Sequence, residues 1–272
     1  MEKLSTDLGV VQETLLLPLM ARAKDATSKH PILNDKKALA LSQQIDTDFD
    51  KYYKYMKKTG MIGLCERALI MDNKVKQFMQ QHPKGKILNI GVGLETAYYR
   101  LNQPKYEWYD LDLPDAMELR AELLPIPNEY VTYIYKSMFD FSWMYDIGDI
   151  DDGLLITVPG VFMYFDEGKV SAFFRTIASR LTGAHIVFDV VSNMGGFFIG
   201  RQVQMAGMKN ATMDWGVMQP KDIEKWSNHI KFVEAIPYFK NTKNYDINIL
   251  LKALLSTNQY FDISQVFHFQ FV

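Results

Sequence analysis

The sequence predicts an α/β protein whose doubly wound, mostly parallel β-sheet follows an all-helical N-terminal segment. Three observations support this prediction. Apolar residues recur at helical spacing through roughly the first 80 residues, short β-rich runs then alternate with helical patterns, and a glycine-containing turn follows the first β-rich run. Alternation of this kind indicates right-handed βαβ units, whose strands lie parallel in one sheet.

Residues 1–82 are expected to form a helical cap or lid. Between Leu64 and Met79, for example, apolar side chains return every three or four positions, with charged residues on the other faces. Breaks between helices are expected at Pro18, around His30-Pro31 and at Thr59-Gly60, where breakers or turn formers interrupt the pattern.

Residues 83–272 are expected to form the α/β domain, with a helical insertion at about 193–228. The last of seven strand candidates alternates strictly between apolar and polar residues, as expected of an antiparallel strand that finishes an otherwise parallel sheet. The seven candidates are Lys86–Ile90, Tyr106–Leu111, Tyr130–Tyr135, Leu154–Val158, His185–Val191, Lys231–Ile236 and Val266–Val272.

Composition excludes several classes of protein. Lysine and arginine total 30 against 32 acidic residues, and this balance leaves no excess positive charge for a nucleic-acid backbone. The longest apolar runs are far below the ~18 residues of a membrane span, so no membrane partner is expected. Cys65 is the only cysteine, which excludes an intramolecular disulfide and favours a reducing, cytoplasmic location.

The glycine turn is the first candidate ligand site. Gly91 and Gly93 directly follow the strand candidate Lys86–Ile90, where glycine lets the backbone turn sharply and approach a ligand closely. Thr96 takes the place of the third glycine of a dinucleotide fingerprint. A merely structural turn would leave the same pattern.

An acidic residue after the next strand strengthens the functional interpretation. Asp112 lies 21 residues after Gly91, at the spacing of an acid that accepts the ribose hydroxyls of an adenosine cofactor. Asp110 points to the same side of the strand and is expected to share this task or to orient Asp112. The pair also matches a short D-x-D metal motif, but the neighbouring glycine turn favours adenosine over metal.

The third strand candidate ends near Ser137 and Met138. In an adenosine-binding sheet this strand end faces the adenine ring, to which a small polar residue and an apolar flank would offer hydrogen bonding and packing. A simple strand-to-loop exit, with Trp143 in the core, explains the same residues.

Several ordered motifs together resemble the leucine carboxyl methyltransferase-like family, in particular its bacterial branch of tetracenomycin-type polyketide O-methyltransferases. The resemblance extends from about Glu13 to Ser192 and is less clear in the last 80 or so residues. The motifs are Asn89–Thr96, Tyr98–Leu101, Trp108–Pro114, Asp140–Trp143 and Gly160–Phe165.

The resemblance implies a class I methyltransferase sheet of seven strands with S-adenosylmethionine as the cofactor. It implies that the cofactor lies across Gly91 and Gly93, with its ribose on Asp112 and its adenine near Ser137 and Met138. It further implies that Arg67 pairs with the methionine carboxylate, a role that suits the planar fork of a guanidinium.

Three positions depart from the family pattern. Pro159 stands where family members often carry an acidic residue that contacts the methionine part of the cofactor. Glu95 replaces a more usual Asp, and Ala97 replaces a frequent Arg. These changes bear on the affinity for the cofactor and leave the glycine and ribose contacts as expected.

Methyl transfer from a sulfonium requires mainly an in-line acceptor in a pocket that excludes water, and the expected acceptor is a small-molecule hydroxyl or carboxylate. The sequence identifies no general base and no metal site, because its five histidines show no ligand spacing. Two alternatives stay open at this stage. They are a nicotinamide-dependent oxidoreductase that uses the same turn and acid, and a non-catalytic adenosylmethionine-binding protein.

Overall fold

A computed structural model of the chain describes residues 4–5, 10–47, 56, 58–192, 215–216, 219–240, 245, 247–261 and 263–272. The expected insertion at 193–228 lies largely outside these described residues. Its described part includes Trp215, which is buried in the main core, and a short helix, α10 (Pro220–Glu224).

All seven expected strands are present, each within two residues of its predicted bounds. They form one sheet. The N-terminal segment is not all-helical as expected, because two short strands within it, β1 (Leu4–Ser5) and β2 (Ile45–Asp46), pair with each other. The strands of the large sheet are β3 (Lys86–Ile90), β4 (Glu107–Asp112), β5 (Val131–Tyr135), β6 (Leu154–Val158), β7 (His185–Val191), β8 (Ile230–Pro237) and β9 (Ser264–Phe271).

The strand order of the sheet is β5-β4-β3-β6-β7-β9-β8, and the order reverses direction between β3 and β6. Strands β3 to β7 pair in parallel, whereas β9 is antiparallel to both of its neighbours. This confirms the expected mixed sheet with an antiparallel last strand. Strand β9 lies between β7 and β8, and its apolar residues are buried. The switch point between β3 and β6 is where sheets of this type bind their ligands.

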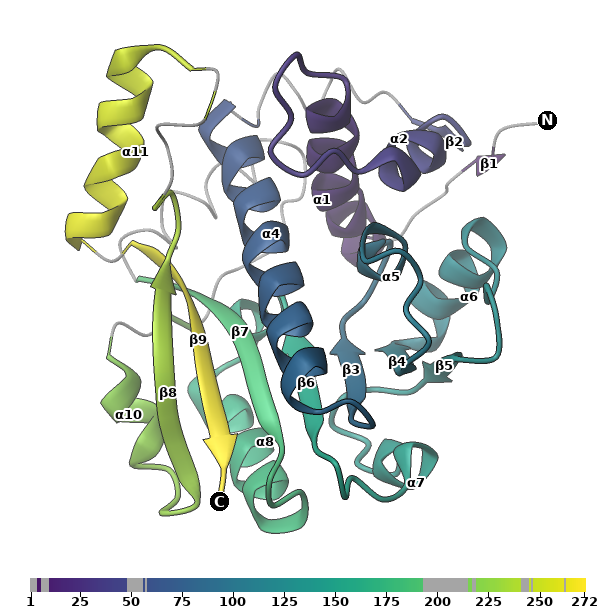
Figure 1. The fold of residues 1–272 in the computed structure, drawn as a ribbon, viewed down its shortest axis with the longest axis vertical. Coiled ribbons are helices and arrows are strands. Elements are labelled where there is room, and N and C mark those ends of the chain that lie inside the picture. Colours follow the sequence, from purple (N-terminus) through teal and green to yellow (C-terminus); the bar gives the residue numbers. More distant parts are fainter. Residues whose placement is uncertain are drawn as a thin grey trace.

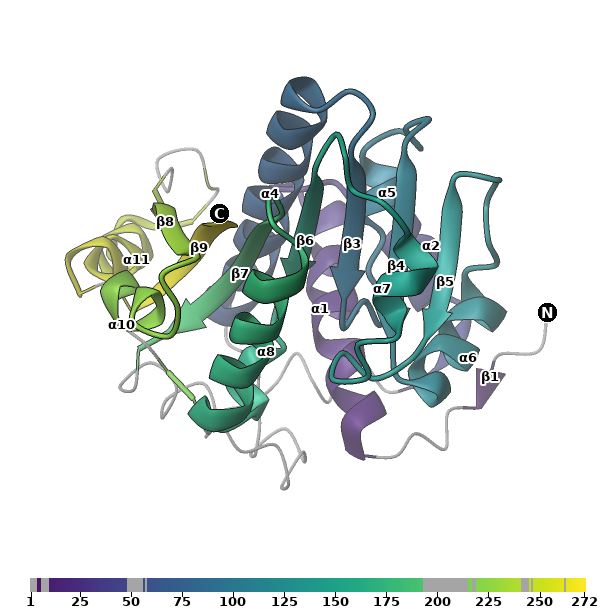
Figure 2. The same cartoon turned by 90° about the horizontal axis from the view of Figure 1, so that it is seen from below.

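Helices cover both faces of the sheet (Figures 1 and 2). On one face, apolar residues of α7 (Trp143–Ile147), α8 (Glu167–Arg180) and α10 join the main core. The opposite face packs against α4 (Lys58–Gln81), whose Val75 and Phe78 share a cluster with Ile87 and Val187. The remaining helices of the described residues are α1 (Val10–Ala26), α2 (Lys36–Ser42), α5 (Ala97–Arg100), α6 (Pro114–Leu123), α11 (Ile249–Phe261) and the 3₁₀ turn η1 (Phe162–Tyr164).

One of the three expected helix breaks is wrong. Pro18 lies inside α1, where the helix continues although proline removes one backbone donor, because buried residues such as Leu16, Leu19 and Met20 hold the segment in place. The break expected at Thr59-Gly60 lies one residue from a helix boundary, since α4 begins at Lys58. The break around His30-Pro31 is confirmed, since no helix is assigned between Ala26 and Lys36.

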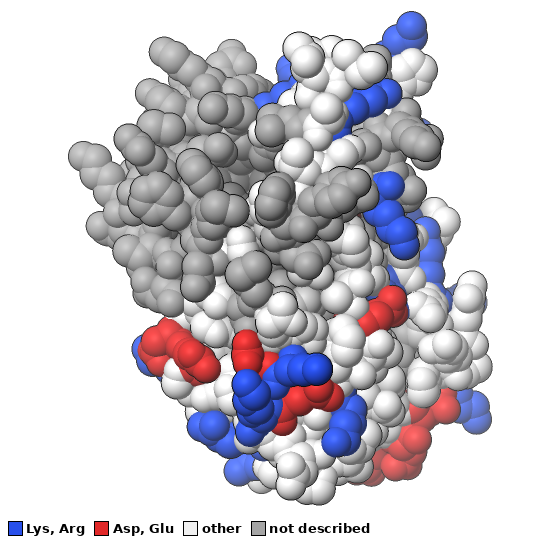
Figure 3. All heavy atoms as spheres, turned by 90° about the vertical axis from the view of Figure 1, so that its left-hand side faces the viewer, with Lys and Arg blue, Asp and Glu red and all other residues white. Residues whose placement is uncertain are grey.

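The face of the molecule beside β8 mixes basic and acidic side chains (Figure 3). Asp222 of α10 and Lys225, directly after this helix, pair at 2.7 Å, for example. Within the described ranges, no helix combines the length and the apolar character of a membrane span.

Three histidines gather where the C-terminal end of α4 meets the sheet. His185 Nδ1 lies 2.9 Å from His268 Nε2, and the His82 ring stacks on Phe78 with its centroid 5.9 Å from that of His185. Burial lowers the pKa of His185 to about 4, with the charges of His82 and Lys74 adding to the effect. Burial and Lys74 also lower the pKa of His268, against the opposing carboxylate of Glu234.

We expect the fold to lose stability as the pH falls from about 6.5 towards 4. The pKa of His185 is lower in the folded chain than its ordinary value of 6.5, so the unfolded chain takes up the proton first. Relative to His185→Gln, which does not titrate, the wild-type protein should lose about 2–3 kcal/mol of unfolding free energy between pH 7.5 and 4.5.

Urea denaturation at several pH values measures this difference. The surface variant His30→Gln is the control and should follow the wild-type curve, because His30 is exposed. Parallel curves for wild type and His185→Gln would show that His185 is not a source of the pH dependence.

Candidate functional site

The glycine turn after β3 can be built only with glycine at two positions. Gly91 and Gly93 have φ angles of +65° and +45°, in the left-handed region that other residues avoid. A Cβ atom on Gly91 would lie 2.3 Å from Val161, and one on Gly93 would lie 2.7 Å from Leu15 in α1. The turn is therefore a tight backbone cradle that the first helix already contacts.

Asp112 ends β4 beside this turn. Its carboxylate accepts hydrogen bonds from the backbone N–H groups of Gly93 and Leu113, both at 2.8 Å. Burial raises the pKa of Asp112, and these two donors oppose the effect. The structure thus brings Gly91, Gly93 and Asp112 together at the carboxyl edge of adjacent parallel strands, as their spacing predicted.

Asp110 lies deeper than Asp112, in spite of their common side of the strand. Its side chain is only 1% exposed and accepts from Arg120 at 2.6 Å, from Trp108 Nε1 at 2.9 Å and from Asn89 Nδ2 at 2.8 Å. Arg120 also donates to the backbone oxygens of Gly93 and Glu95. The Asp110–Arg120 ion pair therefore links β4 to the backbone of the glycine turn.

Ser137 and Met138 follow β5 at the same edge of the sheet. Ser137 is half-buried, and its hydroxyl accepts from the Phe139 N–H at 3.3 Å. Met138 is buried in the main core, and its backbone oxygen accepts from the indole of Trp143 at 3.0 Å. Trp143 itself is fully buried, as the simple strand-to-loop interpretation expected.

A pocket of about 480 Å³, open space included, lies between α4 and the carboxyl ends of β3 and β6. Its wall joins the N-terminal helices to the sheet, so residues that are far apart in the sequence meet there. The lining residues are Arg22, Leu64, Arg67, Ala68, Met71, Asp72, Val75, Asn89, Val92, Glu95, Ala97, Arg100, Thr157 and Pro159.

Arg67 lies in this wall and pairs with an acid that the sequence did not indicate. Its Nη1 is 3.2 Å from Asp189 Oδ2, and the guanidinium lies against Gly160, where a Cβ atom would come within 2.4 Å of Nη1. Burial disfavours the charged guanidinium, but the carboxylate of Asp189 outweighs this effect and raises the pKa of Arg67.

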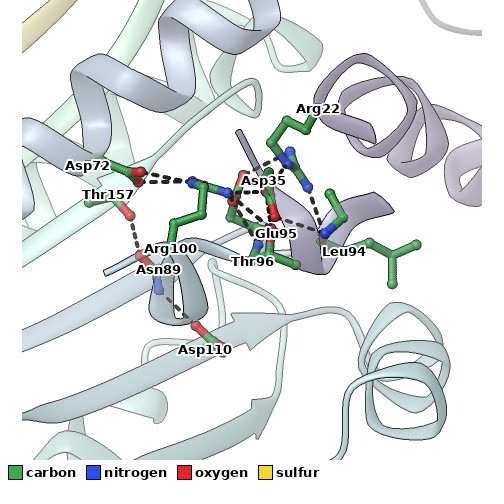
Figure 4. Close-up of polar contacts among 12 residues, drawn as sticks. Arg22, Asp35, Asp72, Asn89, Leu94, Glu95, Thr96, Arg100, Asp110 and Thr157 are labelled. Carbon is green, nitrogen blue, oxygen red and sulfur yellow. Dashed lines mark hydrogen bonds and ion pairs between the residues drawn. The ribbon is translucent and has the colours of Figure 1, made fainter. Parts of the chain in front are cut away.

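A buried network of ion pairs surrounds the glycine turn (Figure 4). Arg22 of α1 pairs with Asp35 at 3.1 Å and with Glu95 at 3.0 Å, and it donates to the Leu94 oxygen. Arg100 of α5 pairs with Asp35 at 2.8 Å, with Glu95 at 2.5 Å and with both oxygens of Asp72. Five segments are thereby fixed to one another: α1, the start of α2, the glycine turn, α5 and α4.

The paired arginines of this network keep the carboxylate of Glu95 charged. Burial alone disfavours the carboxylate of Glu95, but Arg100 and Arg22 outweigh it and lower the pKa of Glu95 to about 2. Asp35 also accepts from Ala38 N at 2.8 Å and so begins helix α2. In the sequence Glu95 is marked only as a departure from the family pattern, and no local motif marks Arg22, Asp35, Asp72 or Arg100.

The chain is similar in sequence to two known methyltransferases. The chain is 29% identical over 225 residues to the tetracenomycin polyketide synthesis O-methyltransferase TcmP of Streptomyces glaucescens, with 82% of each chain covered. It is 24% identical over 260 residues to the S-adenosyl-L-methionine-dependent methyltransferase dpfgK of Gibberella zeae, with 87% of this chain and 85% of the relative covered. The chain matches no protein-family model.

The fold is also that of a solved methyltransferase. The magnesium protoporphyrin IX methyltransferase of Synechocystis, solved with bound SAH, superimposes with a TM-score of 0.50 at 13% identity, over 86% of this chain and 99% of that one. Fold and relatives together define the class: the chain is a class I, S-adenosylmethionine-dependent methyltransferase. Its similarity to TcmP confirms the resemblance to tetracenomycin-type polyketide O-methyltransferases.

We expect Arg100→Met to destabilise the fold strongly. The substitution removes the guanidinium from Asp35, Asp72 and Glu95, and a buried carboxylate without its partner costs about 3–5 kcal/mol. The matched control is Lys225→Met, which breaks an exposed pair of little value, ~0–1 kcal/mol. Urea denaturation compares the two variants, and equal losses of stability would mean that the network is not important for the fold.

Proposed function

We propose that the chain transfers the methyl group of S-adenosylmethionine to a hydroxyl or carboxylate oxygen of a small molecule. Aromatic polyketides are the first acceptors to consider, because the relative TcmP carries that substrate class in its name. The observation that carries the proposal is the meeting of the glycine turn with Asp112 at the switch point of the sheet. Similarity to methyltransferases favours this reaction over the two alternatives that the sequence left open.

The residues around this turn fit the cofactor. The glycine turn permits close approach of the backbone, and the carboxylate of Asp112, held by two N–H groups, is placed to accept the ribose hydroxyls. We assign Asp110 to the support of this site through Arg120, because its oxygens already accept from three donors. Ser137 and Met138 would lie against the adenine, and Arg67 would pair with the methionine carboxylate.

Methyl transfer needs little covalent help from the protein, because the bound cofactor supplies an activated methyl group. The chain's own residues have to hold the acceptor in line, close to attack distance, and exclude water. A carboxylate or phenolate acceptor can attack without a base, whereas a neutral hydroxyl needs a proton acceptor. Aromatic residues suit a flat acceptor. Tyr164 is half-buried at the end of η1, while Tyr52, Tyr53 and Tyr55 lie outside the described residues.

Residues 1–82 are proposed to act as a cap over both binding sites, with residues 83–272 as the cofactor-binding domain. Three contacts support this division. Leu15 of α1 touches the glycine turn, Arg22 lies in the pocket wall, and Arg67 of α4 reaches the ends of β6 and β7. Helix α4 also covers one face of the sheet, so the cap is anchored in the core. A cytoplasmic location and the lack of a nucleic-acid partner stay predictions from composition.

We expect Asp112→Asn to weaken cofactor binding and to leave the fold intact. The substitution keeps the shape of the side chain and removes the charge that would accept two hydroxyl hydrogens. Hydrogen bonds to a charged group contribute ~1.5–3 kcal/mol, so the dissociation constant of S-adenosylhomocysteine should rise about tenfold or more. Calorimetric titration measures the change, and Asp115→Asn, at an exposed position in the following helix, is the control. An unchanged affinity would place the ribose elsewhere.

The acceptor class is tested with radiolabelled cofactor. We expect the purified protein to transfer the labelled methyl group to a phenolic or carboxylate oxygen of an aromatic polyketide. The label should be released from a methyl ester by mild base and retained by an aryl methyl ether, which distinguishes the two oxygen types. Binding of the cofactor without transfer to any member of an aromatic polyketide panel would overturn this choice of acceptor.

A further inference from the structure

The turn after β8 holds two buried aromatic residues, Tyr238 and Phe239, and Phe239 has an unfavourable backbone conformation. Phe239 has a φ angle of +63°, a region that a bulky residue adopts only when its surroundings impose it. The N–H of Phe239 bonds to the buried carboxylate of Glu66, and the ring lies against Gly63, 3.4 Å from where a Cβ atom would stand. Helix α4 thus holds the turn in its strained form.

The strained turn directs Tyr238 towards the carboxyl ends of the strands. The Tyr238 hydroxyl bonds to the carboxylate of Asp189, and burial together with that carboxylate raises the pKa of Tyr238. The hydroxyl therefore stays protonated and donates. Its partner Asp189 also accepts from the Gly160 N–H and from Arg67 Nη1, and the Asp189 side chain is only 4% exposed.

These contacts fix the guanidinium of Arg67 in one orientation. Asp189 holds Nη1 on one side, and the bare backbone of Gly160 lies directly against the guanidinium. A free arginine side chain loses rotamer entropy when it binds a ligand. In this protein that loss has already occurred in the folded chain, while Arg67 still lines the pocket.

We propose that Asp189 and Tyr238 are positioning residues for the cofactor, acting through Arg67. Asp189 orients the guanidinium towards the pocket, and Tyr238 orients Asp189. This inference rests on the proposed pairing of Arg67 with the methionine carboxylate. The negative charge of Asp189 beside Arg67 also weakens the attraction between Arg67 and a second anion, the methionine carboxylate. Preorganisation must outweigh that competition.

Two ligands separate positioning from general damage to the fold. S-adenosylhomocysteine carries the amino-acid carboxylate, and 5′-methylthioadenosine lacks it but retains the adenosine part. We expect Asp189→Asn to weaken binding of S-adenosylhomocysteine about tenfold or more, and Tyr238→Phe about 3- to 10-fold, as measured by calorimetry. Neither should change the affinity for 5′-methylthioadenosine by more than about twofold.

Tyr245→Phe is the matched control. Like Tyr238→Phe, it removes a tyrosine hydroxyl from a carboxylate at this turn. That carboxylate is Glu66, whereas the carboxylate that pairs with Arg67 is Asp189. Tyr245→Phe should keep the wild-type affinity ratio of the two ligands even if it lowers the melting temperature. A loss of both ligands in Asp189→Asn and Tyr238→Phe, or an unchanged or tighter binding of S-adenosylhomocysteine, would overturn the proposal.

Binding by Arg67→Ala and by the wild type distinguishes an error in the proposed cofactor site from an error in the positioning role. If Arg67→Ala binds S-adenosylhomocysteine as tightly as the wild type, the carboxylate does not pair with Arg67, and both the assignment and this inference are wrong. If Arg67→Ala loses affinity while Asp189→Asn and Tyr238→Phe do not, only the positioning role is wrong. A wild-type protein that binds neither ligand would overturn the cofactor site itself.

Discussion

The ion pairs that Arg22 and Arg100 make with Asp35 and Glu95 hold the glycine turn in place, and the geometry of the whole pocket depends on them. These residues come from α1, the start of α2, the turn itself and α5. If any of the four segments moved away, a buried charge would lose its partner at a cost of several kcal/mol. The helices before the sheet are therefore held to the same turn that the cofactor is proposed to cross.

Such a network is not the most economical way to gain stability, because well-packed apolar residues often stabilise an interior as well as buried ions do. What it provides is a polar wall with fixed orientation. Three arginines and two carboxylates line the pocket, namely Arg22, Arg67, Arg100, Asp72 and Glu95. Two further carboxylates, those of Asp35 and Asp189, pair with these arginines. Groups already oriented by one another need little reorganisation when a charged ligand arrives, which is the general basis of electrostatic catalysis and recognition.

The sequence predicts the sheet well because strand periodicity and glycine turns are local signals, and because neighbouring parallel strands end at the same edge. Gly93 and Asp112 meet for that reason. Depth is harder to predict: the sequence left open whether Asp110 shares the task of Asp112 or orients it, and only the structure shows that Asp110 is enclosed by Arg120, Trp108 and Asn89. Ion pairs are hardest: Arg67 and Asp189 are 122 residues apart, and no spacing along the chain marks them. Pro18 failed as a helix break because tertiary burial overrode its local preference.

The departure at Pro159 has a structural counterpart on the neighbouring strand. Val158 and Phe188 are partners in the parallel pairing of β6 and β7, so the residues that follow them, Pro159 and Asp189, are adjacent at the carboxyl edge of the sheet. The N–H of Gly160, directly after the proline, donates to Asp189. Strand β6 therefore supplies no acid at this edge, yet a carboxylate still stands beside position 159. Which chemical groups stand at such a motif therefore depends on the residues of the neighbouring strand as much as on the residue at that position of the sequence.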